Sequence, residues 1–324
     1  MDQLSPKICL SLIMALTLVL LLPALAQAYE REPQKTAIVL AAFGTTEVDA
    51  LEAILNVEKK VKAAFPNHDV HLAFTSNIIR DVWHKRADDA AFKKENPGLE
   101  RLYTIANPLT AMALIQEDGS RAILVQSLHI TNGSEYGDLK NIITQLAGID
   151  ALQESKKPFP YLSLGASALG DGSQANLDRA AKALSSLVDL AKTDNSALVL
   201  MGHGNEHLDV KSYRDFAAAM NKMYNYPIFL GLVEGSPDYE AVLADLKKAK
   251  VKNVLLAPFM LVAGDHAKND MAGDEDDSWA TQLKAAGFGV KTHVKGLGLI
   301  DGWADIYVER LKALEAEHQK KAAK

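Results

Sequence analysis

The chain has 324 residues and a formal net charge of −6 at pH 7, and 48% of its residues are hydrophobic. This length and apolar content suffice for one to three globular domains with buried cores. The acidic balance and the lack of a basic run in the sequence argue against a nucleic-acid partner. The composition therefore indicates a globular protein outside the nucleic-acid-binding classes.

The first residues have the pattern of a secretory signal. Residues 8–22 form an apolar stretch that follows Lys7, and the small residues of "ALAQA" at 24–28 close it. This stretch is short for a membrane-spanning helix, which needs about 20 residues, whereas small residues at its end are typical of a cleavage site. We expect cleavage after Ala28 and a periplasmic mature protein without membrane attachment.

Cys9 is the only cysteine of the chain, and it lies inside this expected signal. A mature protein without thiols excludes thiolate metal sites, iron–sulfur clusters and disulfides. A transition metal would have to be held by histidine, aspartate or glutamate.

From residue 36 onward, short apolar runs alternate with amphipathic helical stretches. We expect strands over residues 36–44, 69–75, 121–130, 161–169, 196–204, 226–235, 252–264 and 289–298. Among the expected helices are residues 48–65, 177–191 and 305–320. This alternation predicts an α/β fold with buried parallel sheets, in which ligands bind beyond the carboxyl ends of the strands.

Two pairs of segments form an internal repeat. Residues 37–50 align with residues 197–210, and residues 123–135 align with residues 254–266, in which Glu135 falls opposite His266. His203 falls opposite Phe43. Duplication of one α/β unit explains both matches in the same order. We therefore predict two similar domains over residues 35–170 and 171–324, with an interdomain cleft and with a terminal helix that packs back on the first domain.

One histidine ends a predicted strand between two glycines. His203 and His207 are four residues apart and would face one metal on a shared helix, but Gly202 and Gly204 disfavour a helix. We expect the strand to end near His203, with His207 peripheral. Glycine on both sides also permits close approach of a flat ligand to the backbone.

Two further histidines and one carboxylate occupy comparable places. His266 follows the predicted strand over residues 252–264, and His129 ends the strand over residues 121–130, six residues before Glu135. We expect His203, His266 and Glu135 to converge on the interdomain cleft. Imidazole and carboxylate ligands suit divalent Co, Ni, Fe or Zn, and a neutral imidazole can also accept protons near neutral pH.

The segments around these residues resemble the anaerobic (class II) sirohydrochlorin cobaltochelatases, which insert Co²⁺ into the tetrapyrrole sirohydrochlorin. The resemblance rests on "VQSLHITNGSEY", "MGHG" and "LVAGDHAKNDMAGDEDDSW", with "AAFGTT" and "AFTS" in support, and it covers about residues 36–303. It implies two similar α/β domains with the tetrapyrrole between them. It also implies a metal chelatase, a lyase of cobalamin or sirohaem biosynthesis, that takes Co²⁺ as a substrate and requires no redox cofactor.

The same resemblance implies roles for individual residues. His203, His266 and Glu135 would bind the metal, His203 would accept a pyrrole proton, and Glu135 would relay or accept the other. Because sirohydrochlorin carries many carboxylates, basic groups are expected in the cleft. The substrate-binding candidates are His129, Arg80 and Lys268, with Lys85 and Arg86 as further basic candidates.

Several alternatives stay open at this point. The export signal does not fit cytoplasmic tetrapyrrole synthesis, so an exported carrier that binds a metal or a tetrapyrrole without turnover is a rival hypothesis. Fe²⁺ insertion, which gives sirohaem, uses the same types of ligand. A second bound tetrapyrrole and a homo-oligomer are also open, and the segment at residues 84–98 could support either.

Overall fold

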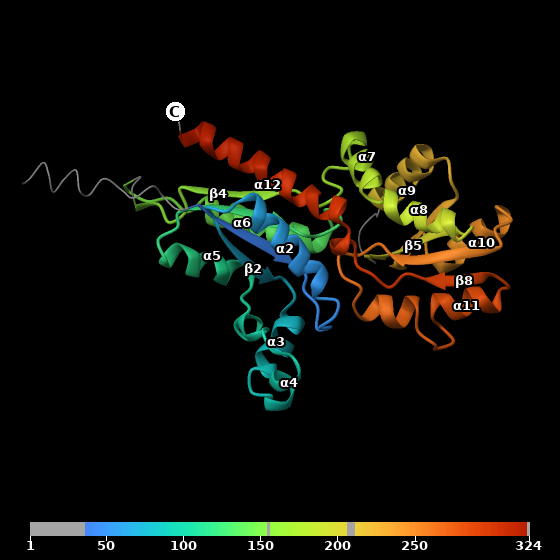
Figure 1. Ribbon diagram of the computed structural model, residues 1–324. Helices are drawn as coiled ribbons and strands as arrows, with labels where there is room; N and C mark the ends of the chain where they lie inside the picture. Colours follow the sequence, from blue (N-terminus) through green and yellow to red (C-terminus); the bar gives the residue numbers. More distant parts are fainter. Residues whose placement is uncertain (1–35, 154–155, 206–210, 323–324) are drawn as a thin grey trace, which may run out of the picture. The chain divides into compact units, whose positions relative to one another are not determined.

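Two four-stranded parallel sheets form the framework of the protein. The computed structural model describes residues 36–153, 156–205 and 211–322 (Figure 1), so the expected signal at residues 1–28 and His207 lie outside the described residues. The first sheet has the order β2-β1-β3-β4, with β1 (Thr36–Ala42), β2 (Asp69–Phe74), β3 (Ala122–Ser127) and β4 (Tyr161–Gly165). The second has the order β6-β5-β7-β8, with β5 (Ala197–Gly204), β6 (Ile228–Glu234), β7 (Asn253–Pro258) and β8 (Gly289–Thr292).

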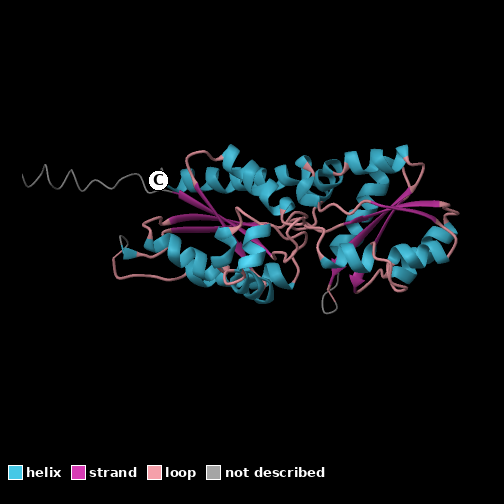
Figure 2. Cartoon of the chain, turned by 60° about the horizontal axis from the view of Figure 1, so that its bottom comes forward, coloured by secondary structure: helices cyan, strands magenta, loops and turns pink. Residues whose placement is uncertain are grey.

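Helices cover both faces of each sheet, as Figure 2 shows. Those of the first half are α2 (Glu52–Ala64), α3 (Asn77–Arg86), α4 (Ala90–Glu95), α5 (Pro108–Glu117) and α6 (Ser134–Ala147), with a 3₁₀ turn at Glu100–Thr104. The later ones are α7 (Gln174–Ala183), α8 (Ser185–Thr193), α9 (Lys211–Tyr224), α10 (Tyr239–Lys248), α11 (Trp279–Ala285) and α12 (Asp301–Ala322). A π-helical turn, η3, spans Ala267–Met271, and a 3₁₀ turn spans Leu297–Leu299.

Alternate residues of the central strands enter different apolar clusters. Ile38 and Leu40 of β1 belong to a cluster that includes residues of both sheets and of α12, whereas Ala37 and Val39 face α5 and α6. Successive side chains of a strand point to opposite faces, so a strand that is apolar at every position is buried on both sides. This explains why β1, β3, β5 and β7 each contain a run of at least four consecutive apolar residues.

The two sheets share one strand order and one register. In the first sheet, Ala37 of β1 lies opposite Ile123 of β3. In the second, Ala197 of β5 lies opposite Val254 of β7. These are the pairs that the sequence repeat makes equivalent. The predicted fold, two similar α/β units built on parallel sheets, is confirmed.

Several predicted elements have different limits. The apolar run at residues 252–264 forms a strand only up to Pro258. Its later apolar residues Leu261 and Val262 pack against the core from a loop. The predicted helix over residues 177–191 is two helices, α7 and α8, which meet at the fully buried Leu184.

The last helix joins several parts of the structure. α12 contacts α2, α7, β3 and β4. The hydroxyl of Tyr307 donates a hydrogen bond to the carbonyl of Leu128 at 3.0 Å, and the hydroxyl of Tyr161 donates to the carbonyl of Leu314 at 3.2 Å. Among the helices that the structure describes, none combines the length and the apolar character of a membrane span.

Candidate functional site

His203 lies at the carboxyl end of β5, where the sequence pattern places it. The strand ends one residue later, at Gly204. The Nδ1 atom of His203 is 3.1 Å from the Gly204 carbonyl oxygen. A carbonyl can only accept a hydrogen bond, so Nδ1 carries the proton and Nε2 keeps its lone pair. The imidazole therefore presents an unprotonated nitrogen away from its own backbone.

The flanking glycines have a different role from the predicted one. A Cβ at Gly204, where φ is +81°, would lie 1.8 Å from the carbonyl oxygen of Glu234, and a Cβ at Gly202 would lie 2.9 Å from Leu232 and 3.0 Å from Tyr213. The space beside both glycines is occupied by the neighbouring strand and by α9. The interpretation that they clear room for a flat ligand is wrong, since they allow the end of β5 to pack closely.

The side chain of His266 lies beside that of His203. It precedes the π-helical turn η3, and its ring centre lies 4.8 Å from that of His203, with the two rings nearly perpendicular. The Nδ1 atom of His266 is 2.5 Å from a carboxylate oxygen of Asp270, four residues later. Ala267 and Met271 anchor the turn because both are fully buried. The structure thus brings together two of the three predicted metal-binding side chains.

Glu135, the third predicted residue, lies in the first turn of α6. Its side chain is exposed and accepts a hydrogen bond from the hydroxyl of Thr75 at 3.3 Å. The side-chain amide of Asn205 donates a hydrogen bond of 2.8 Å to the hydroxyl of Ser134. This bond links the residue that follows β5 to the first residue of α6. Within the described part of the chain, however, no three His, Asp or Glu side chains are grouped as a metal site. The paired histidines therefore form the described centre, with Glu135 in the first turn of α6.

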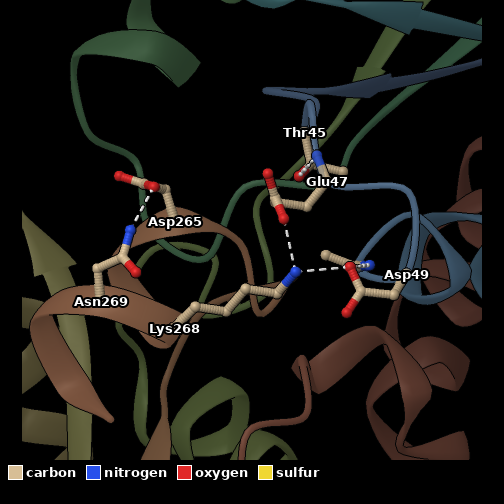
Figure 3. Close-up of polar contacts among 7 residues, drawn as sticks. Thr45, Glu47, Asp49, Asp265, Lys268 and Asn269 are labelled. Atoms are coloured by element: carbon tan, nitrogen blue, oxygen red, sulfur yellow. Dashed lines mark hydrogen bonds and ion pairs between the residues drawn. The ribbon is translucent and has the colours of Figure 1, made fainter. Parts of the chain in front are cut away.

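Lys268 connects this centre to the loop after β1 (Figure 3). Its ammonium group is 2.6 Å from Glu47 and 2.7 Å from Asp49. Burial on its own lowers the pKa of Lys268, but the hydrogen bonds and charges of the two carboxylates outweigh it and raise that pKa. The positive charge predicted for substrate carboxylates is thus already paired. We call this contact of Lys268, Glu47 and Asp49 the clasp.

Arg80 is also engaged within the protein. Its side chain is only 8% exposed, and its guanidinium donates to the carbonyls of Phe74 at 2.6 Å and Thr75 at 3.1 Å and to the side chain of Asn77. These bonds satisfy carbonyls at the end of β2, which gives Arg80 a role in holding the β2–α3 turn.

In the segment at residues 84–98, Arg86 is used for packing. The guanidinium of Arg86 lies 4.5 Å from the ring centre of Trp83 and 4.4 Å from that of Phe92, which joins α3 to α4 by cation–π contacts. Lys85 is exposed on α3.

His129 follows the carboxyl end of β3 by two residues and is partly buried. Its Nδ1 atom is 2.8 Å from the hydroxyl of the fully buried Ser127, and its Nε2 atom has no hydrogen-bond partner among the described residues. Burial lowers the pKa of His129 to about 4. The ring is therefore neutral at physiological pH and cannot attract a substrate carboxylate by charge.

Two acidic residues at this edge were missed from the sequence. Asp270 contacts His266, and Glu234 ends β6 opposite Gly204 of β5. The spacing of four residues in "HAKND" was a signal for the first, because such residues are neighbours on a helical turn. An acid that closes the apolar run "IFLGLVE" was the signal for the second.

Comparison with known proteins places this geometry in a family context. The family model described as "Cobalt chelatase (CbiK)" matches residues 36–315. The sirohydrochlorin cobaltochelatase CbiKC of Nitratidesulfovibrio vulgaris is 31% identical over 280 residues, which cover 86% of this chain and 90% of that protein. The sirohydrochlorin cobaltochelatase of Salmonella typhimurium is 32% identical over 267 residues, which cover 82% and 90%.

Solved structures share the fold at low sequence identity. SirB from Bacillus subtilis with Fe³⁺ has a TM-score of 0.59 and 16% identity, with 88% of this chain and 98% of that chain covered. The sirohydrochlorin chelatase SirB in complex with cobalt, from Bacillus subtilis subspecies spizizenii, has a TM-score of 0.56 and 15% identity, with 86% and 95% covered. These similarities support the arrangement of two parallel sheets.

Proposed function

The chain belongs to the cobalt chelatase (CbiK) family, and we propose that it inserts Co²⁺ into sirohydrochlorin with release of two protons. The observation that carries this proposal is the pair of imidazoles, His203 and His266, whose ring centres lie 4.8 Å apart at the carboxyl end of the second sheet. Ligands of parallel α/β sheets bind at this edge. The family relatives named as sirohydrochlorin cobaltochelatases supply the identity of the substrate.

The histidine pair has the chemistry that metal delivery requires. Co²⁺ is a substrate here, and neutral imidazole nitrogen is among its preferred protein ligands. His203 offers Nε2, because its Nδ1 proton is bonded to the Gly204 carbonyl. Co²⁺ held by His203 and His266 would then be passed to the four nitrogens of the macrocycle.

Two protons must leave the macrocycle as the metal enters. Each pyrrole N–H loses its proton and forms a bond to Co²⁺, which keeps its oxidation state, so no electron is transferred. Bending of the bound macrocycle would expose the nitrogen lone pairs to the metal. We assign one proton to a histidine of the pair, with His203 as the acceptor that the family resemblance implies. We assign the other to Glu135, whose exposed carboxylate accepts a hydrogen bond from Thr75.

We further propose that the protein acts after export to the periplasm. The support is the apolar stretch at residues 8–22 with the small residues at 24–28. Amino-terminal sequencing of the protein from a periplasmic extract should begin at Tyr29. Recovery of the intact chain from the cytoplasm would contradict export.

Turnover separates the chelatase from an exported carrier. Purified protein is mixed with sirohydrochlorin and Co²⁺, and the change in macrocycle absorption is followed against a control with metal alone. We expect insertion well above that control rate. Stoichiometric binding of metal or macrocycle at the control rate would instead identify a carrier, and parallel assays with Fe²⁺ decide between the two metals.

A further inference from the structure

The carboxylate of Asp270 contacts one histidine of the pair directly. Asp270 is 43% exposed, His266 is 38% exposed, and the two side chains meet through Nδ1 and Oδ2 at 2.5 Å. We infer that Asp270 is a positioning residue, which holds the His266 imidazole in one tautomer and one orientation so that Nε2 faces the substrate metal. This inference rests on the proposed function, because it adds a role for Asp270 at the same site.

The tautomer follows from the chemistry of the partner. An ionised carboxylate accepts hydrogen bonds and donates none, so the proton of the neutral imidazole must reside on Nδ1 of His266. Nε2 then carries the lone pair that binds a metal. Carboxylates in this position behind a metal-binding histidine fix the ring orientation and raise the basicity of the ligand.

The turn that carries Asp270 is held in place by independent contacts. Its buried residues Ala267 and Met271 pack in the core of the second sheet. Lys268 bonds to Glu47 and Asp49 in the clasp, and Asn269 donates a hydrogen bond to Asp265 at 2.7 Å (Figure 3). These bonds of Lys268 and Asn269 are thus made to residues other than Asp270. A π-helical turn is rare and is frequently found at functional sites, and here it brings the side chains of His266 and Asp270 into contact.

The two histidines are therefore held differently. His203 is bonded to a neutral backbone carbonyl at 3.1 Å, whereas His266 is bonded to a carboxylate at 2.5 Å. Both arrangements leave Nε2 free of a proton. Only the second can be changed by a side-chain substitution, so Asp270 offers a direct test of positioning.

The test uses the full chain labelled with ¹⁵N, at one fixed pH. Long-range ¹H–¹⁵N spectra report which ring nitrogen of His266 is protonated, and a His266→Gln variant identifies its signals. Wild-type His266 should be protonated at Nδ1 and bare at Nε2. Asp270→Asn has nearly the same shape, but its amide can donate to Nδ1 and so favour the proton on Nε2. We expect this variant to lose the wild-type tautomer and to bind Co²⁺ alone about 10- to 100-fold more weakly.

Asp265→Asn is the matched control, because it lies on the same segment and contacts Asn269 rather than His266. It should keep both the wild-type tautomer and the wild-type Co²⁺ affinity. A wild-type His266 protonated at Nε2 would overturn the inference even if Asp270→Asn failed to fold. Unchanged tautomer and affinity in folded Asp270→Asn would overturn it as well. Neither readout uses sirohydrochlorin, so a failure of the chelatase assay is distinguishable.

Discussion

The close packing at the end of β5 makes Gly204→Ala a severe substitution. Gly204 has a φ of +81°, and an added Cβ would lie 1.8 Å from the backbone oxygen of Glu234. The left-handed conformation costs an L-residue about 1–2 kcal/mol, and overpacking of a close contact adds about 1–3 kcal/mol. We therefore expect the free energy of unfolding to fall by about 2–5 kcal/mol, with loss of metal insertion because His203 is displaced.

Gly287→Ala separates the two contributions. Gly287 has a φ of +91°, and a Cβ added there would meet no atom within 4 Å. This control should lose only the conformational contribution of about 1–2 kcal/mol and should keep full activity. Urea unfolding of both variants gives the difference directly. Equal losses of stability, or an active Gly204→Ala enzyme of wild-type stability, would refute the packing argument.

Two further substitutions test the predicted substrate-binding residues Lys268 and His129. Lys268→Met breaks the clasp and should lower the free energy of unfolding by only about 1 kcal/mol, since Glu47 is 37% and Asp49 72% exposed. The KM for sirohydrochlorin should stay unchanged. A raised KM at constant stability would instead support substrate binding by Lys268. His129 has a pKa lowered by burial to about 4, so the unfolded chain binds its proton at higher pH than the folded protein does. The resulting stability is present above about pH 6.5 and is lost, by up to about 3 kcal/mol, as the pH falls toward 4. His129→Gln should show a shallower loss in urea unfolding across that range, and identical pH dependence in both proteins would contradict this.

The sequence was sufficient for the framework and for the histidines. Uninterrupted apolar runs identify strands buried on both faces, and the repeat anticipates the register, since it makes Ala37 and Ala197 equivalent and both pair as it requires. His203 was found because an apolar run ends there. The pattern does not predict α5 and α6. It also extends the strand before His266 too far, because Leu261 and Val262 are apolar residues of a partly buried loop.

The roles of the charged residues depend on contacts that sequence patterns do not contain. Lys268 pairs with carboxylates more than 200 positions earlier in the chain. The resemblance makes Arg80 a candidate for binding substrate carboxylates, but its guanidinium donates hydrogen bonds to carbonyls at the end of β2. The role of Gly202 and Gly204 is also not predictable from the sequence, because a missing side chain permits close approach of either a ligand or a neighbouring strand.

The rate of Co²⁺ insertion by His203→Ala and His266→Ala, at limiting Co²⁺, tests the central claim most directly. Removal of either imidazole should lower the rate by about 100-fold or more, because a metal ligand or a proton acceptor is lost. His318→Gln, on α12, is the matched control and should insert the metal at the wild-type rate. Wild-type rates in both His203→Ala and His266→Ala would contradict the assignment of the paired histidines as the site of metal insertion.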